Sequence, residues 1–225
     1  MSAALSIGFR ERATEGEILD QEVAEDEARR SLADIRLVNR WLGGRRALRR
    51  AVLPYLKPGA RLLDVGCGSG DLPAFLADGA PEPFLAVGLD RKALHVREAP
   101  FPVRPVVADV RALPFAPRTF DVVTASLFLH HFDAPELPAV ISTLHGLCRG
   151  ALVVNDLHRS AVAWGFSRLF FPFLFQSRIS VSDGLLSIRR GFRPRELQDA
   201  FAAAGLPRPE IERRFPYRLV AVAEA

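Results

Sequence analysis

The stretch LLDVGCGSGDL at residues 62–72 decides the fold. A short apolar run, typical of a buried strand, leads directly into a glycine-rich turn, and a helical pattern follows from Asp71. Glycines in such a turn permit positive φ and let a ligand lie against bare backbone. The amides at the start of the following helix then face that ligand. The spacing is Gly-x-Gly-x-Gly, which differs from the Gly-x-Gly-x-x-Gly of dinucleotide-binding folds. The stretch therefore predicts a ligand site where a buried strand ends.

Apolar runs and helical patterns alternate along the rest of the chain. Strands are predicted over 61–66, 84–90, 103–109, 120–126 and 150–156, and helices near 71–79, 91–98, 135–148 and 193–204. Continuous apolar runs are typical of strands covered on both faces, and this alternation indicates a parallel α/β sheet. Two last strands, separated by Pro216, predict an antiparallel hairpin within 210–223. We therefore predict a Rossmann-like α/β fold with a seven-stranded, mostly parallel sheet.

Three acids follow the first three predicted strands. Asp90 comes twenty residues after Gly70, and Asp109 comes nineteen residues after Asp90. Asp90 can accept hydrogen bonds from both hydroxyls of a ribose, and Asp109 can hold the exocyclic amine of an adenine. Together with Asp64 and the glycine loop, this spacing predicts an adenosine site.

These motifs resemble those of the class I S-adenosylmethionine-dependent methyltransferases, from about Arg61 to the C-terminal end of the sequence. The resemblance implies S-adenosylmethionine as cofactor, with S-adenosylhomocysteine as product. In this family the first acid and the glycines hold the amino acid part of the cofactor, the second acid holds the ribose, and the third holds the adenine. The implied cofactor-binding residues are Asp64, Gly66, Cys67, Gly68, Gly70, Asp90, Arg91, Asp109, Val110 and Ser126.

A narrower resemblance covers residues 34–72. The two N-terminal helical patterns and the Gly-Asp-Leu ending of the loop are similar to the start of quinone-biosynthesis C-methyltransferases, with Asn39, Arg45 and Arg46 as the corresponding residues. A bacterial group that acts on phenolic polyketides or other lipophilic small molecules fits as well.

Two histidines are candidates for the catalytic base. His131 lies just after the fourth predicted strand, and His158 follows the fifth. Methyl transfer is an in-line displacement, so the enzyme must align donor and acceptor and exclude water. For a phenol with a pKa near ~10, a histidine with a near-neutral pKa can remove the proton. The alternative is a structural role for both side chains. The predicted substrate-binding residues are Asn39, Trp41, His130, Trp164 and Phe170.

The segment 161–186 is rich in phenylalanine and is not explained by the core fold. We predict a lid insertion over about 157–190 that builds an apolar pocket for the substrate. An ordinary packing helix and a shallow contact with a membrane surface are the alternatives.

No metal is predicted. Catechol-type O-methyltransferases use an acid at the end of strand four and an Asp-Asn pair near strand five. Asn155-Asp156 resembles part of that set, but the position after strand four holds Ala125-Ser126. The ligand set for a divalent ion is therefore incomplete.

Composition sets broader limits on the 225-residue chain. The hydrophobic fraction of 49% is enough for a core, and the net charge of +4 is too mild to indicate a polyanion partner. Residues 1–34 carry −5 and 35–61 carry +8; the acidic stretch 15–30 predicts a solvated helix or a frayed terminus. Two cysteines, no signal peptide and no apolar run of spanning length favour a cytoplasmic protein.

The sequence predicts a helical cap over 1–57 and a methyltransferase domain over 58–225, acting as a monomer or homodimer. The expected reaction is O-methylation of a phenolic or polyketide-type hydroxyl on a lipophilic small molecule. C-methylation of a quinol ring is one alternative, and a non-catalytic S-adenosylmethionine-binding protein is another. A nucleic-acid substrate is not expected, because no RNA-binding module or amino-directed methyltransferase signature is visible.

Overall fold

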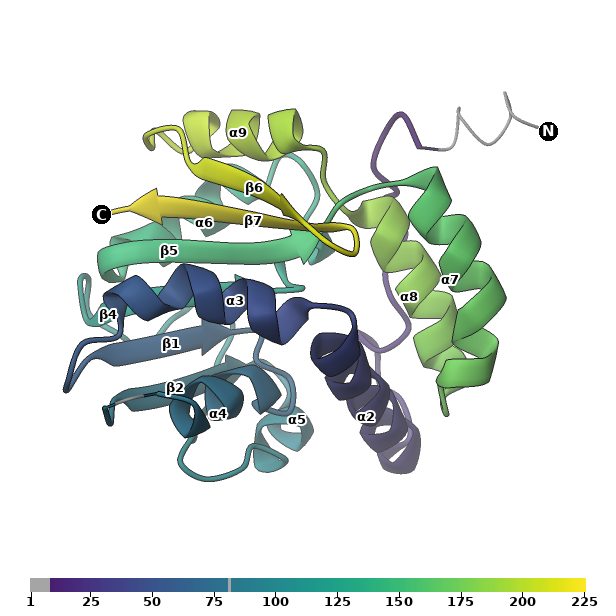
Figure 1. Ribbon diagram of the computed structural model, residues 1–225, viewed down its shortest axis with the longest axis horizontal. Helices are drawn as coiled ribbons and strands as arrows, with labels where there is room; N and C mark the ends of the chain where they lie inside the picture. The colour runs from purple at the N-terminus through teal and green to yellow at the C-terminus, as the bar shows by residue number, and fades with distance from the viewer. Residues whose placement is uncertain (1–8, 81) are drawn as a thin grey trace.

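A seven-stranded sheet with strand order β3-β2-β1-β4-β5-β7-β6 forms the centre of the molecule (Figure 1). The computed structural model describes residues 9–80 and 82–225. The strands are β1 (Arg61–Val65), β2 (Leu85–Asp90), β3 (Arg104–Val107), β4 (Phe120–Ser126), β5 (Cys148–Leu157), β6 (Glu210–Arg214) and β7 (Arg218–Glu224). Strands β1 to β5 are parallel, whereas β7 runs antiparallel to β5 and to β6. The predicted fold class and all seven strands are confirmed.

Helices cover both faces of the sheet. They are α2 (Glu25–Trp41), α3 (Gly44–Val52), α4 (Asp71–Asp78), α5 (Ala93–Arg97), α6 (Leu137–Gly146), α7 (Ala161–Leu174), α8 (Arg178–Arg190) and α9 (Pro194–Ala203), with short 3-10 helices η1 (Leu53–Tyr55) and η2 (Leu129–His131). Helices α3 and α4 pack on one face and α6 and α9 on the other. Neighbouring residues of one strand reach opposite cores, as Leu62 and Leu63 do, which explains the continuous apolar runs.

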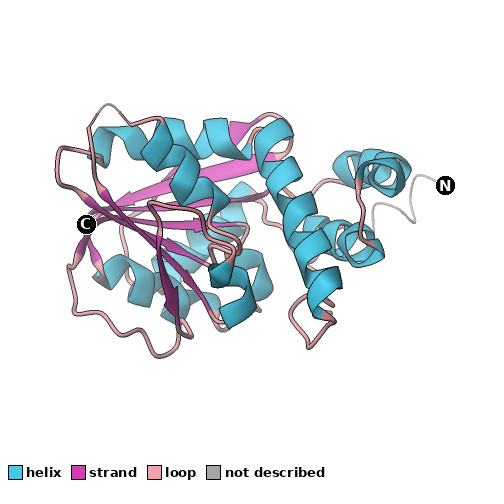
Figure 2. Cartoon of the chain, turned by 90° about the horizontal axis from the view of Figure 1, so that it is seen from below, coloured by secondary structure: helices cyan, strands magenta, loops and turns pink. Residues whose placement is uncertain are grey.

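A group of helices stands at the carboxyl ends of the parallel strands. In Figure 1 these strands point to the right, where α2, α7 and α8 lie, and Figure 2 shows the same group from below. Ser160 caps α7 by accepting a hydrogen bond from the Ala163 amide, and Ser177 caps α8 in the same way. The predicted insertion over about 157–190 is therefore a pair of helices, α7 and α8.

The acidic segment before α2 differs from the prediction. Within this stretch the helix begins only at Glu25. We call residues 12–21 the strap; this segment has no regular secondary structure and runs past α8 and η2. Asp183 on α8 accepts hydrogen bonds from the amides of Ile18 and Leu19, and Lys92 donates to the carbonyls of Leu19 and Gln21. The prediction of a solvated helix or frayed terminus is wrong for this part, because side chain and backbone contacts fix it.

Helix α3 belongs to the core of the sheet. Ala47, Leu48 and Val52 pack with Leu62 of β1 in one apolar cluster. Helix α2 instead lies at the carboxyl ends of the strands. The division into a cap over 1–57 and a domain over 58–225 stays a prediction. Within the described part of the chain, no helix combines the length and the apolar character that crossing a bilayer requires.

Candidate cofactor and substrate cavity

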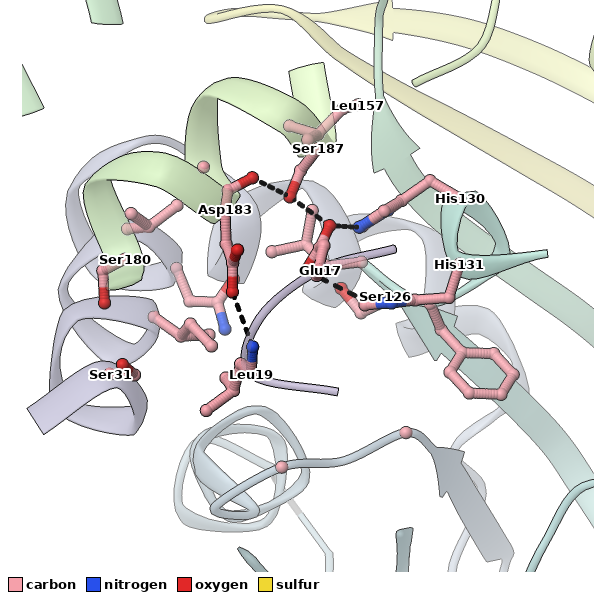
Figure 3. A pocket seen from close by; sticks show the side chains of 18 of the residues that line it. Glu17, Leu19, Ser31, Ser126, His130, His131, Leu157, Ser180, Asp183 and Ser187 are labelled. Carbon is pink, nitrogen blue, oxygen red and sulfur yellow. Dashed lines mark hydrogen bonds and ion pairs between the residues drawn. The ribbon is translucent and has the colours of Figure 1, made fainter. Parts of the chain in front are cut away.

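A cavity of about 690 Å³ lies between the carboxyl ends of β1, β2 and β4, the strap, and helices α2, α7 and α8. Open α/β sheets place their ligands at this edge. Nine of the ten predicted cofactor-binding residues line the cavity, and the exception is Gly70. Figure 3 shows the end of the cavity near the strap, with Glu17 between His130 and Ser187.

The glycine loop after β1 has the backbone that the sequence predicts. Gly66, Gly68 and Gly70 all have positive φ, of 67°, 52° and 67°. A Cβ on Gly66 would lie 2.2 Å from the ring of Phe128, and a Cβ on Gly70 would lie 2.8 Å from the Cβ of Ala99. Gly70 therefore shapes the loop from outside the cavity, whereas Gly66 and Gly68 lie on its wall.

Asp64 is a buried carboxyl at the floor of the cavity. It accepts a hydrogen bond of 2.6 Å from the Thr124 hydroxyl of the neighbouring strand. Burial raises the pKa of Asp64 to about 7, and the negative charges of Asp71 and Asp90 add to this effect against the Thr124 hydrogen bond. A cationic group at this place would stabilise the ionised form, so Asp64 is suited to the ammonium or sulfonium of a cofactor.

Asp90 at the end of β2 is held in one orientation by its neighbours. Its two oxygens accept hydrogen bonds from the amides of Gly68 (3.0 Å) and Lys92 (2.9 Å), and His95 Nδ1 lies 3.3 Å away. Burial opposes ionisation, but the hydrogen bond and charge of His95 keep the pKa of Asp90 below its usual value. The carboxylate lines the cavity as an acceptor, which is the property a ribose diol requires.

Asp109 lies two residues beyond the end of β3 rather than on the strand. Its Oδ1 accepts a hydrogen bond of 2.8 Å from the Arg111 amide, so the carboxylate is oriented by its own turn. Val110 beside it is buried, and both residues line the cavity. The turn thus offers a carboxylate and an apolar side chain together, as an adenine site would.

Cys67 and Ser126 are buried at the cavity wall. Burial raises the pKa of the Cys67 thiol well above its ordinary value, and the nearby charges of Asp64 and Asp90 raise it further. The thiol therefore stays protonated, which argues against a nucleophilic role. Ser126 Oγ accepts a hydrogen bond of 2.8 Å from the Asn155 amide group.

Two stacked histidines and the acids Glu17, Asp20 and Asp156 form a network at the substrate end. Figure 3 shows Glu17 between the two histidines. His130 Nδ1 lies 2.7 Å from Asp156, and its Nε2 lies 3.3 Å from Glu17 of the strap. His130 is fully buried; burial alone lowers a histidine pKa, but Asp156 and then Glu17 outweigh it and raise the pKa to about 10. His130 is therefore a cation held between two carboxylates. It reaches the cavity wall, but both of its ring nitrogens already have partners.

His131 is the accessible member of the pair. Its Nδ1 lies 2.8 Å from Asp20 of the strap and its Nε2 lies 3.9 Å from Glu17. The interaction with His131 lowers the pKa of Asp20 to about 2 although burial opposes ionisation. A carboxylate at Nδ1 fixes the tautomer that leaves the Nε2 lone pair available. His131 is thus oriented as a base would be.

The other candidate base, His158, lines the cavity at the end of β5. Its pKa is lowered by partial burial and by the positive charges of Arg213, Arg159 and Arg193. The imidazole is therefore neutral near pH 7, but no carboxylate orients it within the part of the chain that the structure describes.

The predicted substrate residues divide into two groups. Asn39 and Phe170 line the cavity, and Asn39 donates a hydrogen bond to Asp71. Trp41 does not line it; its side chain is 70% exposed and lies under the guanidinium of Arg40. Trp164 packs on Phe9 instead, with ring centroids 6.2 Å apart. Neither tryptophan lines this cavity, so a role for them in substrate binding stays a prediction.

One group of side chains could hold a metal ion among residues 9–80 and 82–225. Glu17, His130 and His131 each offer a ligand atom, and these atoms lie within 4.8 Å of one another. In the structure Glu17 lies between the two imidazoles, and Asp156 and Asp20 lie at their Nδ1 atoms, so these side chains already pair with one another. The strand-four and strand-five residues do not converge on an ion either, since Ser126 and Asn155 bond to each other.

Sequence reasoning missed the acids of the strap and a buried arginine. Glu17 and Asp20 meet histidines more than a hundred residues away. Arg218 at the start of β7 is fully buried and lines the cavity, and among the described residues its one side-chain hydrogen bond is that of 3.5 Å to Asn39. No local sequence pattern indicates such long-range partners.

Comparison with known proteins agrees with this geometry. Residues 62–150 match the family model described as a methyltransferase domain. The chain is 31% identical over 148 residues to an uncharacterized methyltransferase of Synechocystis, covering 61% of this chain and 64% of that one. It is also 31% identical over 123 residues to the demethylmenaquinone methyltransferase of Lysinibacillus sphaericus, covering 51% of each. The chain thus spans about half to two thirds of these relatives.

A solved structure of similar fold is the S-adenosylmethionine-dependent methyltransferase from Aquifex aeolicus. Its TM-score is 0.64 at 14% identity, and the match covers 90% of this chain and 99% of that one. The chain therefore carries a methyltransferase domain over 62–150 and has the fold of the Aquifex enzyme. The fold predicted from the sequence is confirmed, and the matched domain agrees with the predicted class and cofactor.

Proposed function

We propose that this protein transfers the methyl group of S-adenosylmethionine to a phenolic oxygen of a lipophilic aromatic small molecule. One observation carries the proposal: a single cavity joins the glycine loop and Asp90 to His131 and the aromatic side chains of α7. Donor and acceptor can therefore lie in one enclosed space. Apolar walls favour an aromatic acceptor and keep water from the sulfonium.

The cofactor half of the cavity has an acceptor for each polar part of the cofactor. Asp64 faces the position of the amino acid part, Asp90 that of the ribose, and Asp109 with Val110 that of the adenine. These residue roles follow the family pattern, and their common placement on the cavity wall supports them.

We assign the base to His131. In-line displacement at the methyl carbon is fastest with a phenolate oxygen as nucleophile, and a phenol with a pKa near ~10 is mostly protonated at pH 7. His131 Nε2 accepts the phenolic proton while Asp20 at Nδ1 stabilises the imidazolium that forms. The phenolate oxygen then attacks the methyl carbon, and the C–S electron pair returns to sulfur to give S-adenosylhomocysteine.

C-methylation of a quinol ring is the second candidate. The relative that is a demethylmenaquinone methyltransferase supports it. Removing a proton from a ring hydroxyl also activates the neighbouring carbon, so the same His131 and Asp20 pair serves both reactions. The identity of the methylated atom must therefore be measured in the product.

The test uses methyl-labelled S-adenosylmethionine with a fractionated extract of lipophilic metabolites, followed by mass spectrometry. Label on the oxygen of a phenol supports the proposal, and label on a ring carbon supports the quinol alternative. Label on protein or RNA, or no transfer with intact cofactor binding, would overturn the assigned substrate class.

Two variants test the base. His131→Asn is expected to lower kcat by about a hundredfold or more, the usual contribution of a general base. Asp20→Asn is expected to lower kcat less and to shift the pH–rate profile, because it acts through His131. His158→Asn is the matched comparison. If His158→Asn abolishes turnover while His131→Asn does not, the assignment to His131 is wrong.

A further inference from the structure

One face of helix α7 is apolar and turned to solvent. Its exposed side chains are Val162, Phe166, Leu169, Phe170 and Phe173. Their spacing places them along one side of a helix, while Ala163 and Phe171 on the other side pack in an apolar cluster. Phe173 is 84% exposed. Contiguous apolar surface of this kind marks an interaction site more often than chance exposure does.

This apolar face continues around the mouth of the cavity. Phe166 and Phe170 of α7 and Phe215 of the β6–β7 turn line the cavity while remaining exposed, and Phe215 is 92% exposed. The Phe215 carbonyl lies against Gly43, two residues from the exposed Trp41. We call Trp41, Phe166, Phe170, Phe173 and Phe215 the aromatic rim.

The helices that carry the aromatic rim, and the helices that follow them, also carry exposed arginines. Arg40 and Arg46 lie on α2 and α3, and Arg168 and Arg178 lie on α7 and α8. Arg40 lies over the Trp41 ring at 5.3 Å, and Arg168 lies over Trp164 at the same distance. Guanidinium groups beside exposed aromatic rings are suited to an interface between lipid headgroups and acyl chains.

We propose that the aromatic rim docks on the surface of an anionic lipid bilayer, so that a lipophilic acceptor enters the cavity directly from the bilayer. A second copy of the chain is a poorer occupant. A two-fold interface places the same patch opposite itself, and here that would bring the exposed arginines of both copies together. The entry route rests on the proposed function; the docking does not.

Vesicle co-sedimentation of the full chain tests the docking. Vesicles of phosphatidylcholine alone are compared with vesicles that also contain phosphatidylglycerol, at low and high salt. Binding to the anionic vesicles is expected, and salt is expected to weaken it. The double variant Trp41→Ser, Phe173→Ser is expected to bind about tenfold or more weakly, because two apolar anchors are lost. Neither residue lines the cavity, so S-adenosylhomocysteine affinity should not change.

Phe101→Ser is the matched control. Phe101 is 90% exposed, as an anchor of the rim is, but it lies beside β3, outside the cavity. It should bind vesicles as the wild type does. Equal binding by all variants, or no binding to anionic vesicles, overturns the proposal, and a wild-type dimer that the double variant disrupts would assign the rim to a second copy.

Transfer to a water-soluble phenol without vesicles separates this proposal from the proposed function. Transfer without vesicle binding refutes the docking alone. Vesicle binding without transfer to any lipophilic acceptor refutes the proposed function alone.

Discussion

Among single residues, Gly66 and Gly59 allow a matched test of the glycine loop. Both have positive φ, of 67° and 74°, but only Gly66 has a neighbour within reach of a Cβ, the ring of Phe128. Gly59→Ala is expected to lose about 1–2 kcal/mol of unfolding free energy through backbone strain and to keep its cofactor affinity. Gly66→Ala carries the same strain and also pushes Phe128 toward the cavity.

Titration calorimetry with S-adenosylhomocysteine measures the difference. An affinity loss of about tenfold or more is expected for Gly66→Ala alone, which corresponds to about 1.4 kcal/mol or more. Similar affinities for both variants would mean that the loop does not need bare backbone at Gly66.

Asp64 predicts a dependence of stability on pH. Its pKa is about 7 in the folded protein and about 4 in an unfolded chain, so the folded state holds a proton that the unfolded state releases. The contribution of Asp64 to stability therefore falls as pH rises from about 4 to 7. Asp64→Asn should gain stability relative to the wild type between pH 5 and pH 8, as measured by urea unfolding.

The same variant should bind the cofactor more weakly at pH 8, by about tenfold, because it cannot form a charge-assisted contact with a cationic ligand. If Asp64→Asn is less stable than the wild type at pH 5 and at pH 8, the prediction for stability is wrong. If it binds the cofactor as the wild type does at pH 8, the prediction for binding is wrong.

The strap is held against α8 by Asp183, whose carboxylate accepts hydrogen bonds from two strap amides. Asp183→Asn replaces one accepting oxygen by a donor facing the amide of Ile18 or Leu19, so the strap should open more often. Trypsin cleavage after Arg12 and S-adenosylhomocysteine dissociation are both expected to become faster, by about fivefold or more. Asp199→Asn on the exposed side of α9 is the control. Unchanged rates in Asp183→Asn would show that the strap is held by other contacts.

The helices and strands of the sheet were predictable from local sequence, whereas the strap was not. Each strand and each core helix was predictable, because apolar periodicity is set by residues within one element. The strap was not, because Glu17 and Asp20 are held by His130 and His131, far away in sequence. The side of each aromatic helix that faces the cavity was not predictable either. Composition indicates that a helix is aromatic, but packing of α7 against Phe9 and α8 decides which of its side chains line the cavity.

For the whole molecule, catalysis is expected to need no metal. The one candidate group within residues 9–80 and 82–225 consists of Glu17, His130 and His131, and both imidazoles already pair with carboxylates. Dialysis against a chelator should leave both methyl transfer and thermal stability unchanged. Loss of activity that zinc or manganese restores in the wild type, but not in Glu17→Gln, would instead assign an ion to this group.

The path of the strap has a consequence for the timing of the reaction. Leu19 and Asp20 cross the cavity between Arg91, which follows the ribose acid, and His131. Asp20 contacts both the guanidinium of Arg91 and the imidazole of His131, so a movement of this segment breaks the two contacts together. The carboxylate that orients the base is therefore in place only while the strap lies over the ribose side of the cavity.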